Sequence, residues 1–263
     1  MRWRKIQVRK FWACLRATND EVLQSIERTN SVIKRIVNVS VGGLMVAVLA
    51  AAWALTSEAK EPGHFVPASV SKAGDIPYPA SSLDAGVVTL SVDLDKTGQV
   101  IAVTILRDIS SVSGPAAQTV RSWTYTPATL NGKPVPSTLT VNIVYDPGFL
   151  GADNIPLPPP SQVQPIATKD QPYYAPQLNA ATFAPYPAKA KAQGAVVLNV
   201  TLDANGNAAH VAILRDVPPL TASATGALKN WNLSAASYDG NSIPSHMIVA
   251  FVFRSPSAPL PGN

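Results

Sequence analysis

The chain has 263 residues with 24 prolines and one cysteine, and its isoelectric point of about 9.3 raises the question of a nucleic-acid partner. The basic character is local. Residues 1–36 hold nine Lys or Arg and three Asp or Glu, whereas the rest of the chain holds 12 and 13. Nucleic-acid binding rests on phosphate neutralisation, so a nearly neutral body argues against it. The single cysteine, Cys14, allows no intramolecular disulfide.

Residues 37–56 are predicted to form one transmembrane helix. The segment from Val37 to Leu55 contains no charged residue. Its 19 residues correspond to roughly 28 Å of helix, which matches the hydrocarbon thickness of a bilayer. Because the basic residues precede this segment, the positive-inside bias places 1–36 in the cytoplasm and the remainder outside it.

A cleaved signal peptide is the alternative for this segment. The small residues Ala50, Ala52 and Ala54 offer cleavage sites. However, the charged region before the apolar run is about 36 residues long, well beyond that of a typical signal. We therefore favour an uncleaved anchor.

The body of the chain is an internal duplication. The sequence "ILRD" occurs at Ile105–Asp108 and again at Ile213–Asp216, an offset of 213 − 105 = 108 residues. The same offset relates "PYPA" at Pro77–Ala80 to its second copy at Pro185–Ala188 and needs no gap in between. It also relates single residues of special type, namely Gly86 to Gly194, Gly98 to Gly206, Trp123 to Trp231 and Gly132 to Gly240.

Each copy begins with a predicted hairpin. In the first copy, apolar and polar residues alternate from Val88 to Leu94, as a half-buried strand requires. A turn containing Gly98 follows, and glycine supplies the positive φ that such turns need. The next strand is expected to present Ile101, Val103 and Ile105 on one face.

The second half of each copy predicts a helix and a last strand. Ala116, Val120 and Trp123 follow helical spacing, and Pro115 suits the first turn, with Ser113 as a candidate cap. The turns Asn131-Gly132 and Asp239-Gly240 then precede the final strands, Ser137–Tyr145 and Ser245–Phe253. The predicted fold class is α+β, in which two small strand–strand–helix–strand domains each place one helix on an antiparallel sheet.

The composition between these units sets the domain boundaries. The proline-rich stretch that includes "PLPPP" is typical of a semi-rigid extended spacer. We therefore expect a linker at 57–74, a first domain at 75–148, a proline-rich linker at 149–181, a second domain at 182–256 and a tail at 257–263.

Both units resemble the C-terminal domain of TonB, the periplasmic protein that connects the inner membrane to outer-membrane receptors. The resemblance rests on Tyr-Pro-Ala before the first strand and on the strand–Asp-x-x-Gly–strand hairpin. It extends to "RSWTYTPA" at Arg121–Ala128 and "NGKPVPSTLTVNIVY" at Asn131–Tyr145.

The resemblance implies a single-pass inner-membrane protein with a periplasmic body that binds proteins, is not an enzyme and uses no cofactor. Members of the family bind an extended peptide as an added strand at a sheet edge and near the Tyr-Pro segment. The expected partners are an outer-membrane receptor or another periplasmic protein and ExbB/ExbD-type motor proteins, and self-association is left open. The residues expected to contact a partner are Tyr78, Pro79, Tyr186 and Pro187, together with Thr140, Asn142, Ile248 and Ala250 on the final strands.

Two alternatives accompany this interpretation. The Tyr-Pro pairs can instead lock the chain as it enters the sheet. The protein can also be a periplasmic scaffold or sensor whose domains bind peptides or each other, because the span lacks the histidine expected of motor-coupled TonB proteins and the first linker is only about 20 residues long.

Other polar motifs predict no chemistry. Asp93 and Asp95 resemble the start of a calcium loop but lack its later glutamate, so a hairpin turn explains them. Arg107-Asp108 and Arg215-Asp216 are interpreted as surface ion pairs or turn caps, with a recognition patch as the alternative. The three histidines, His64, His210 and His246, have no second ligand at metal spacing and are expected to be bystanders.

Overall fold

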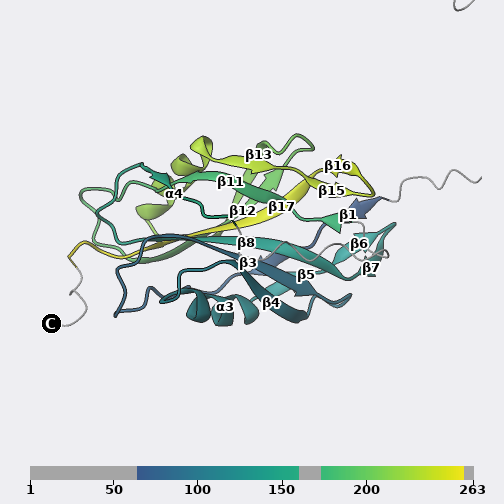
Figure 1. Ribbon diagram of the computed structural model, residues 1–263, viewed down its shortest axis with the longest axis horizontal. Helices are drawn as coiled ribbons and strands as arrows, with labels where there is room; N and C mark the ends of the chain where they lie inside the picture. The colour runs from purple at the N-terminus through teal and green to yellow at the C-terminus, as the bar shows by residue number, and fades with distance from the viewer. Residues whose placement is uncertain (1–63, 160–172, 258–263) are drawn as a thin grey trace, which may run out of the picture. The chain divides into compact units, whose positions relative to one another are not determined.

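The computed structural model describes residues 64–159 and 173–257 (Figure 1). The predicted cytoplasmic tail with Cys14, the predicted span 37–56 and the first part of the linker 57–74 lie outside the described residues. Within the described ranges, no helix is both long enough and apolar enough to cross a bilayer.

The predicted strand–strand–helix–strand order is present in both copies, and the described chain is mostly β with two short helices. We call the copies the first and second repeat. The first repeat contains β3 (Gly86–Leu94), β4 (Val100–Arg107), α3 (Ser113–Arg121) and β8 (Ser137–Asp146). The second repeat contains β12 (Gly194–Leu202), β13 (Ala208–Arg215), α4 (Leu220–Ala227) with a 3-10 turn η2 (Leu228–Asn230), and β17 (Ser245–Phe253).

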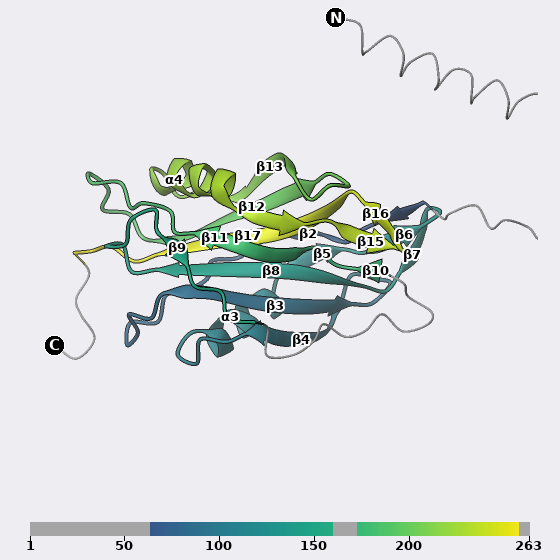
Figure 2. The same cartoon turned by 45° about the horizontal axis from the view of Figure 1, so that its top comes forward.

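The two repeats share one six-stranded sheet in the order β13-β12-β17-β8-β3-β4. Pairing is antiparallel within each repeat, but β17 and β8 pair in parallel, from Ile248 opposite Val141 to Phe253 opposite Asp146. The antiparallel pairing predicted within each unit is thus confirmed, and the parallel junction joins the two units into one mixed sheet. Figure 2 shows β8 and β17 side by side at the centre. Because each three-stranded sheet would otherwise end in a long, apolar edge strand, edge-to-edge pairing covers both edges at once.

The helices cover opposite faces of this sheet, as Figure 1 shows for α3 and α4. Val141 of β8 shares a core with Val120 of α3, whereas the equivalent residue of β17, Val249, shares a different core with Ala224 of α4. β8 and β17 are parallel neighbours, and the two repeats are related by a half turn about the direction of these strands. Equivalent residues of the two strands therefore point to opposite faces of the sheet. Each final strand is consequently buried on both faces.

We call the segment that precedes each repeat its leader (65–76 for the first repeat and 173–184 for the second). The face of each repeat that carries no helix is covered by the leader of the other repeat. The first leader contains β1 (Phe65–Val66) and β2 (Ser69–Lys72), and the second contains β10 (Tyr173–Tyr174) and β11 (Gln177–Thr182). The end of the predicted proline-rich linker therefore contains β10 and most of β11, and Leu178 of β11 is buried. Phe65 and Tyr173, which are 108 residues apart, lie with their ring centroids 4.7 Å apart.

The leaders pair with short strands of the repeats. β1 and β2 pair with β6 (Ala128–Leu130) and β5 (Thr124–Thr126), while β10 and β11 pair with β15 (Ala236–Tyr238) and β14 (Asn232–Ser234). Three further strands complete these small sheets: β7 (Lys133–Val135), β9 (Asn154–Ile155) and β16 (Asn241–Ile243).

The predicted turns are confirmed. Gly98 has a φ of +84°, and the carboxylate of Asp95 accepts hydrogen bonds from the backbone N–H of Thr97 at 2.7 Å and of Gln99 at 2.9 Å. Asn131 and Gly132 both have positive φ, as a tight hairpin turn requires.

Two local predictions fail. Ser113 is not the N-cap of α3; that position is Val112, and the Ser113 hydroxyl instead accepts the backbone N–H of Ile109 at 2.8 Å. Ile101 does not share the buried face of Val103, because the β3–β4 register shifts beside it and leaves Ile101 63% exposed. An extra residue in one strand turns the following side chains to the other face.

Candidate functional site

The four residues expected to bind a partner on the final strands lie in the interior of the sheet. Thr140 and Asn142 of β8 pair with β3, and Ile248 and Ala250 of β17 pair with β12. The remaining edges of β8 and β17 pair with each other, and we call this β8–β17 junction the seam. All four residues are almost fully buried. Strand addition at these residues would require the seam to open, and their contact with a partner stays a prediction.

The arginines of the two "ILRD" motifs fasten the segments that cover the sheet. Arg107 donates from Nη2 to the Leu178 carbonyl at 3.2 Å and from Nε to the Pro158 carbonyl at 3.0 Å. Its Nη1 donates to the Thr89 hydroxyl at 3.1 Å, which donates to Asn142 at 2.9 Å. Arg107 of the first repeat thus holds the leader of the second.

Arg215 makes the reciprocal attachment. Its Nη2 lies 3.2 Å from Asp75 in the first leader, and its Nη1 donates to the Ala195 carbonyl. The same Asp75 carboxylate accepts the backbone N–H of Ala195 at 3.2 Å. Neither arginine makes its hydrogen bonds to the aspartate that follows it in the sequence, so the motif acts across the repeats and not within one turn.

Both Tyr-Pro tyrosines close a loop at the entrance to their repeat. The Tyr78 hydroxyl donates to the Asp84 carbonyl at 2.6 Å, and the Tyr186 hydroxyl donates to the Ala192 carbonyl at 2.7 Å, six residues on in each case. Pro79 and Pro187 are half-buried beside them. This geometry favours the locking role of the Tyr-Pro pairs, while their contact with a partner stays a prediction.

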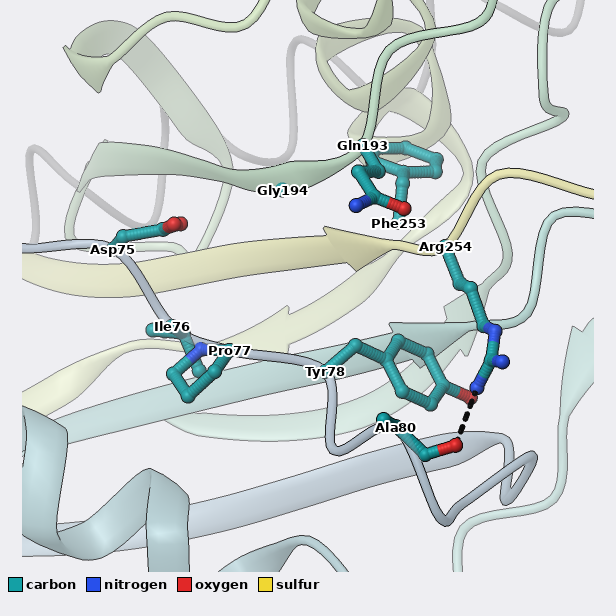
Figure 3. Close-up of a pocket in the computed structure, with 9 residues that line it drawn as sticks. All are labelled: Asp75, Ile76, Pro77, Tyr78, Ala80, Gln193, Gly194, Phe253 and Arg254. Atoms are coloured by element: carbon teal, nitrogen blue, oxygen red, sulfur yellow. Dashed lines mark hydrogen bonds between the residues drawn. The ribbon is translucent and has the colours of Figure 1, made fainter. Parts of the chain in front are cut away.

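A cavity of about 470 Å³ lies between the Tyr-Pro segment of the first repeat and the second repeat (Figure 3). Pro77 and Tyr78 line one side, and Gly194 and Arg254 line the other. Arg254 Nη1 donates to the carbonyls of Ala80 at 3.2 Å and Ser82 at 3.0 Å, so the second repeat fixes the loop that follows Tyr78.

The end of the seam holds a buried carboxylate that the sequence analysis did not single out. Asp146 is fully buried, and burial raises its pKa to about 6, although the backbone N–H of Gly148 donates to it at 2.8 Å. Burial raises the pKa of the neighbouring Tyr78 hydroxyl, and the Asp146 charge raises it further. Asp146 and Arg254 are 108 residues apart, so a search for opposite charges at equivalent positions would have found them.

The histidines and carboxylates do not form a metal centre in the described ranges, where no three His, Cys, Asp or Glu side chains gather. His64 and His210 are exposed. His246 is half-buried, and burial lowers the pKa of its imidazole.

A protein-family model described as Gram-negative bacterial TonB protein C-terminal matches residues 78–147 and 182–255. The chain belongs to the TonB C-terminal family. The two matches confirm the tandem repeat, one in each half of the shared sheet. TonB C-terminal proteins couple transport and are not enzymes. No curated protein and no solved structure matched the chain.

Proposed function

We propose that this chain is a TonB-like protein, anchored in the inner membrane, whose periplasmic body binds partner proteins at sheet edges and couples the inner membrane to outer-membrane transport. The tandem family match carries the proposal. The expected partners are an outer-membrane receptor on the periplasmic side and ExbB/ExbD-type motor proteins at the membrane.

The sheet topology bears on where a partner would bind. A single TonB-like unit has a free edge at its last strand, but here β8 and β17 occupy each other's edge. The ends of the six-stranded sheet are β4 and β13. An extended peptide therefore has two routes, opening of the seam or addition at an outer edge, and only the second leaves the fold intact.

The occupied seam also favours a second candidate function. A protein whose two edges satisfy each other resembles a self-contained scaffold, which binds periplasmic proteins without transmitting work from the membrane. The two candidates differ in whom they contact and in whether contact depends on the proton gradient.

In-cell photo-crosslinking tests the proposal. A photoreactive residue replaces Ile101 on β4 or His210 on β13, both exposed, and Asn241 on β16 serves as an exposed control outside the six-stranded sheet. We expect an outer-membrane receptor to be captured from an edge position and not from Asn241. The capture should weaken when the proton gradient is dissipated. Capture of periplasmic proteins alone, unchanged by that treatment, would leave the scaffold.

A further inference from the structure

The strand β13 ends the sheet, and its one Asp, Glu, Lys or Arg residue is Arg215 at its last position, which pairs with Asp75. Its one paired neighbour in the described ranges is β12. From Ala208 to Leu214 it contains no Asp, Glu, Lys, Arg or Pro. Monomeric proteins usually blunt such edges with charge, proline or a covering segment. An edge strand with seven consecutive residues that are not Asp, Glu, Lys, Arg or Pro is therefore typical of a strand that accepts a partner.

Two apolar side chains on β13 have the spacing that an added strand would meet. Val211 lies opposite Val200 and Ile213 opposite Leu198, and both of these β12 residues belong to the core under α4. Val211 and Ile213 therefore lie on the helix-covered face of the sheet, two residues apart. Ile213 is 51% exposed, which is unusual for an isoleucine beside a core.

A groove of about 600 Å³ lies beside this edge, between β13 and the end of the α4 helix. Figure 2 shows α4 near β13 at the top of the view. The apolar wall of the groove includes Val211, Leu228 and Trp231. The Trp231 indole is held in place because its Nε1 donates to the Thr182 carbonyl at 3.2 Å and its ring lies 5.5 Å from that of Phe251.

The groove also carries a single charge. Lys229 is the one charged residue among those that line it, and it is exposed. Two asparagines, Asn207 and Asn232, supply the remaining exposed polar side chains. A complementary ligand thus needs apolar side chains on one face and a negative charge within reach of Lys229.

We propose that the β13 edge and this groove form a docking site for an extended peptide segment of a partner protein, with apolar residues at alternate positions and one acidic residue. The inference rests on the proposed function and places its partner contact on the second repeat. The peptide adds beside β13 through backbone hydrogen bonds, its alternate side chains pack against Val211, Ile213 and Trp231, and its carboxylate pairs with Lys229.

Fluorescence anisotropy with labelled synthetic peptides tests this site on the detergent-solubilised full chain. The probes alternate Val and Thr over six residues and end in Glu at either terminus, and matched probes end in Lys. We expect the Glu probes to bind at least about tenfold more tightly than the Lys probes. Lys229→Glu should reverse that preference, which loss of folding cannot do.

Matched edge variants separate this site from the opposite edge. Ile213→Asp should abolish binding of the Glu probes. Ile101→Asp, an equally exposed isoleucine on β4, should leave it unchanged. Equal effects of the two substitutions, or a preference insensitive to Lys229→Glu, would overturn the proposal.

Two further outcomes distinguish this inference from the proposed function. If a dimer seen by light scattering dissociates in Ile213→Asp while no peptide binds, the edge pairs with a second copy of the chain and the peptide site is refuted. If the peptides bind only through β4 and in-cell capture of a receptor persists, the inference fails while the transport function stands.

Discussion

The buried carboxylate of Asp146 makes the stability of the protein depend on pH in an unusual direction. Its pKa of about 6 in the folded chain lies above the ordinary value of 3.8, because burial penalises the charged form. A raised folded-state pKa means that the folded state binds the proton more tightly than the unfolded state. The contribution of this group to stability therefore falls as pH rises from about 4 to about 6, and stays low above that.

The magnitude follows from the same two values. A difference of about two pKa units corresponds to roughly 3 kcal/mol, which is the penalty for keeping Asp146 ionised at neutral pH. Asp146→Asn removes the charge and keeps an oxygen to accept the Gly148 N–H. The second carboxylate oxygen has no hydrogen-bond partner, so the new amide N–H there costs about 1 kcal/mol of the gain.

We expect Asp146→Asn to be more stable than the natural chain by about 2 kcal/mol at pH 7.5 and equal to it, or slightly less stable, at pH 4. Urea unfolding followed by tryptophan fluorescence, in half-unit steps from pH 4 to pH 8, measures this difference. Asp153→Asn, an exposed aspartate after the seam, is the control and should show no pH-dependent difference. A stability difference that is the same at pH 4 and pH 7.5 would refute the argument.

Three further predictions concern the attachment of a leader, a hairpin turn of the first repeat and the dependence of the second repeat on the first. Arg107→Ala removes hydrogen bonds to Thr89, Leu178 and Pro158 and should lower the free energy of unfolding by roughly 2–4 kcal/mol. Arg107→Lys should recover less than half of this loss in the same urea assay, because an ammonium group lacks the planar fork of a guanidinium. Gly98→Ala should cost about 2 kcal/mol, since φ is +84° and the new Cβ would lie 2.6 Å from the Tyr125 carbonyl oxygen, while Gly114→Ala, with open space around it, should be neutral or stabilising. Residues 173–257 expressed alone should aggregate or unfold, because the face of β17 opposite α4 loses its cover; a folded monomer by size exclusion and circular dichroism would contradict this.

Local patterns in the sequence predict the three long strands and the helix of each repeat, but not the short strands of the leaders or their partners. Alternation from Val88 to Leu94, the glycine turns and the helical spacing of Ala116, Val120 and Trp123 each depend on a few neighbouring residues, and both copies carry them. The prediction failed at Ile101, because a shift in strand register depends on pairing with β3 and leaves no local mark. The role of the Tyr-Pro segments in binding a partner stays a prediction, and the hydrogen bonds of the Tyr78 and Tyr186 hydroxyls to carbonyls six residues on follow only from the tertiary structure.

The candidate site shows the same division. The final strand of the second repeat reads "MIVAFVF", with apolar residues on both faces, which is typical of strands buried on both sides and indicates a central position, whereas "LTVNIVY" has Thr140 and Asn142 on its second face. That signal was present in the second repeat, yet the residues Thr140, Asn142, Ile248 and Ala250 were assigned to a free edge on the strength of the family resemblance. The groove beside β13 has no signature in the sequence, because Val211, Lys229 and Trp231 meet only after α4 packs on the sheet.

The sequence by itself determined the duplication, the order of strands and helix in each copy and the family. These depend on short-range geometry and on direct comparison of residues. Only the tertiary structure decided that the copies pair in parallel along β8 and β17, that their helices lie on opposite faces, and that each "ILRD" arginine fastens a leader belonging to the other repeat. Two equivalent edges can satisfy their backbone groups in several ways, and the choice among them rests on which arrangement buries both faces of both strands at once.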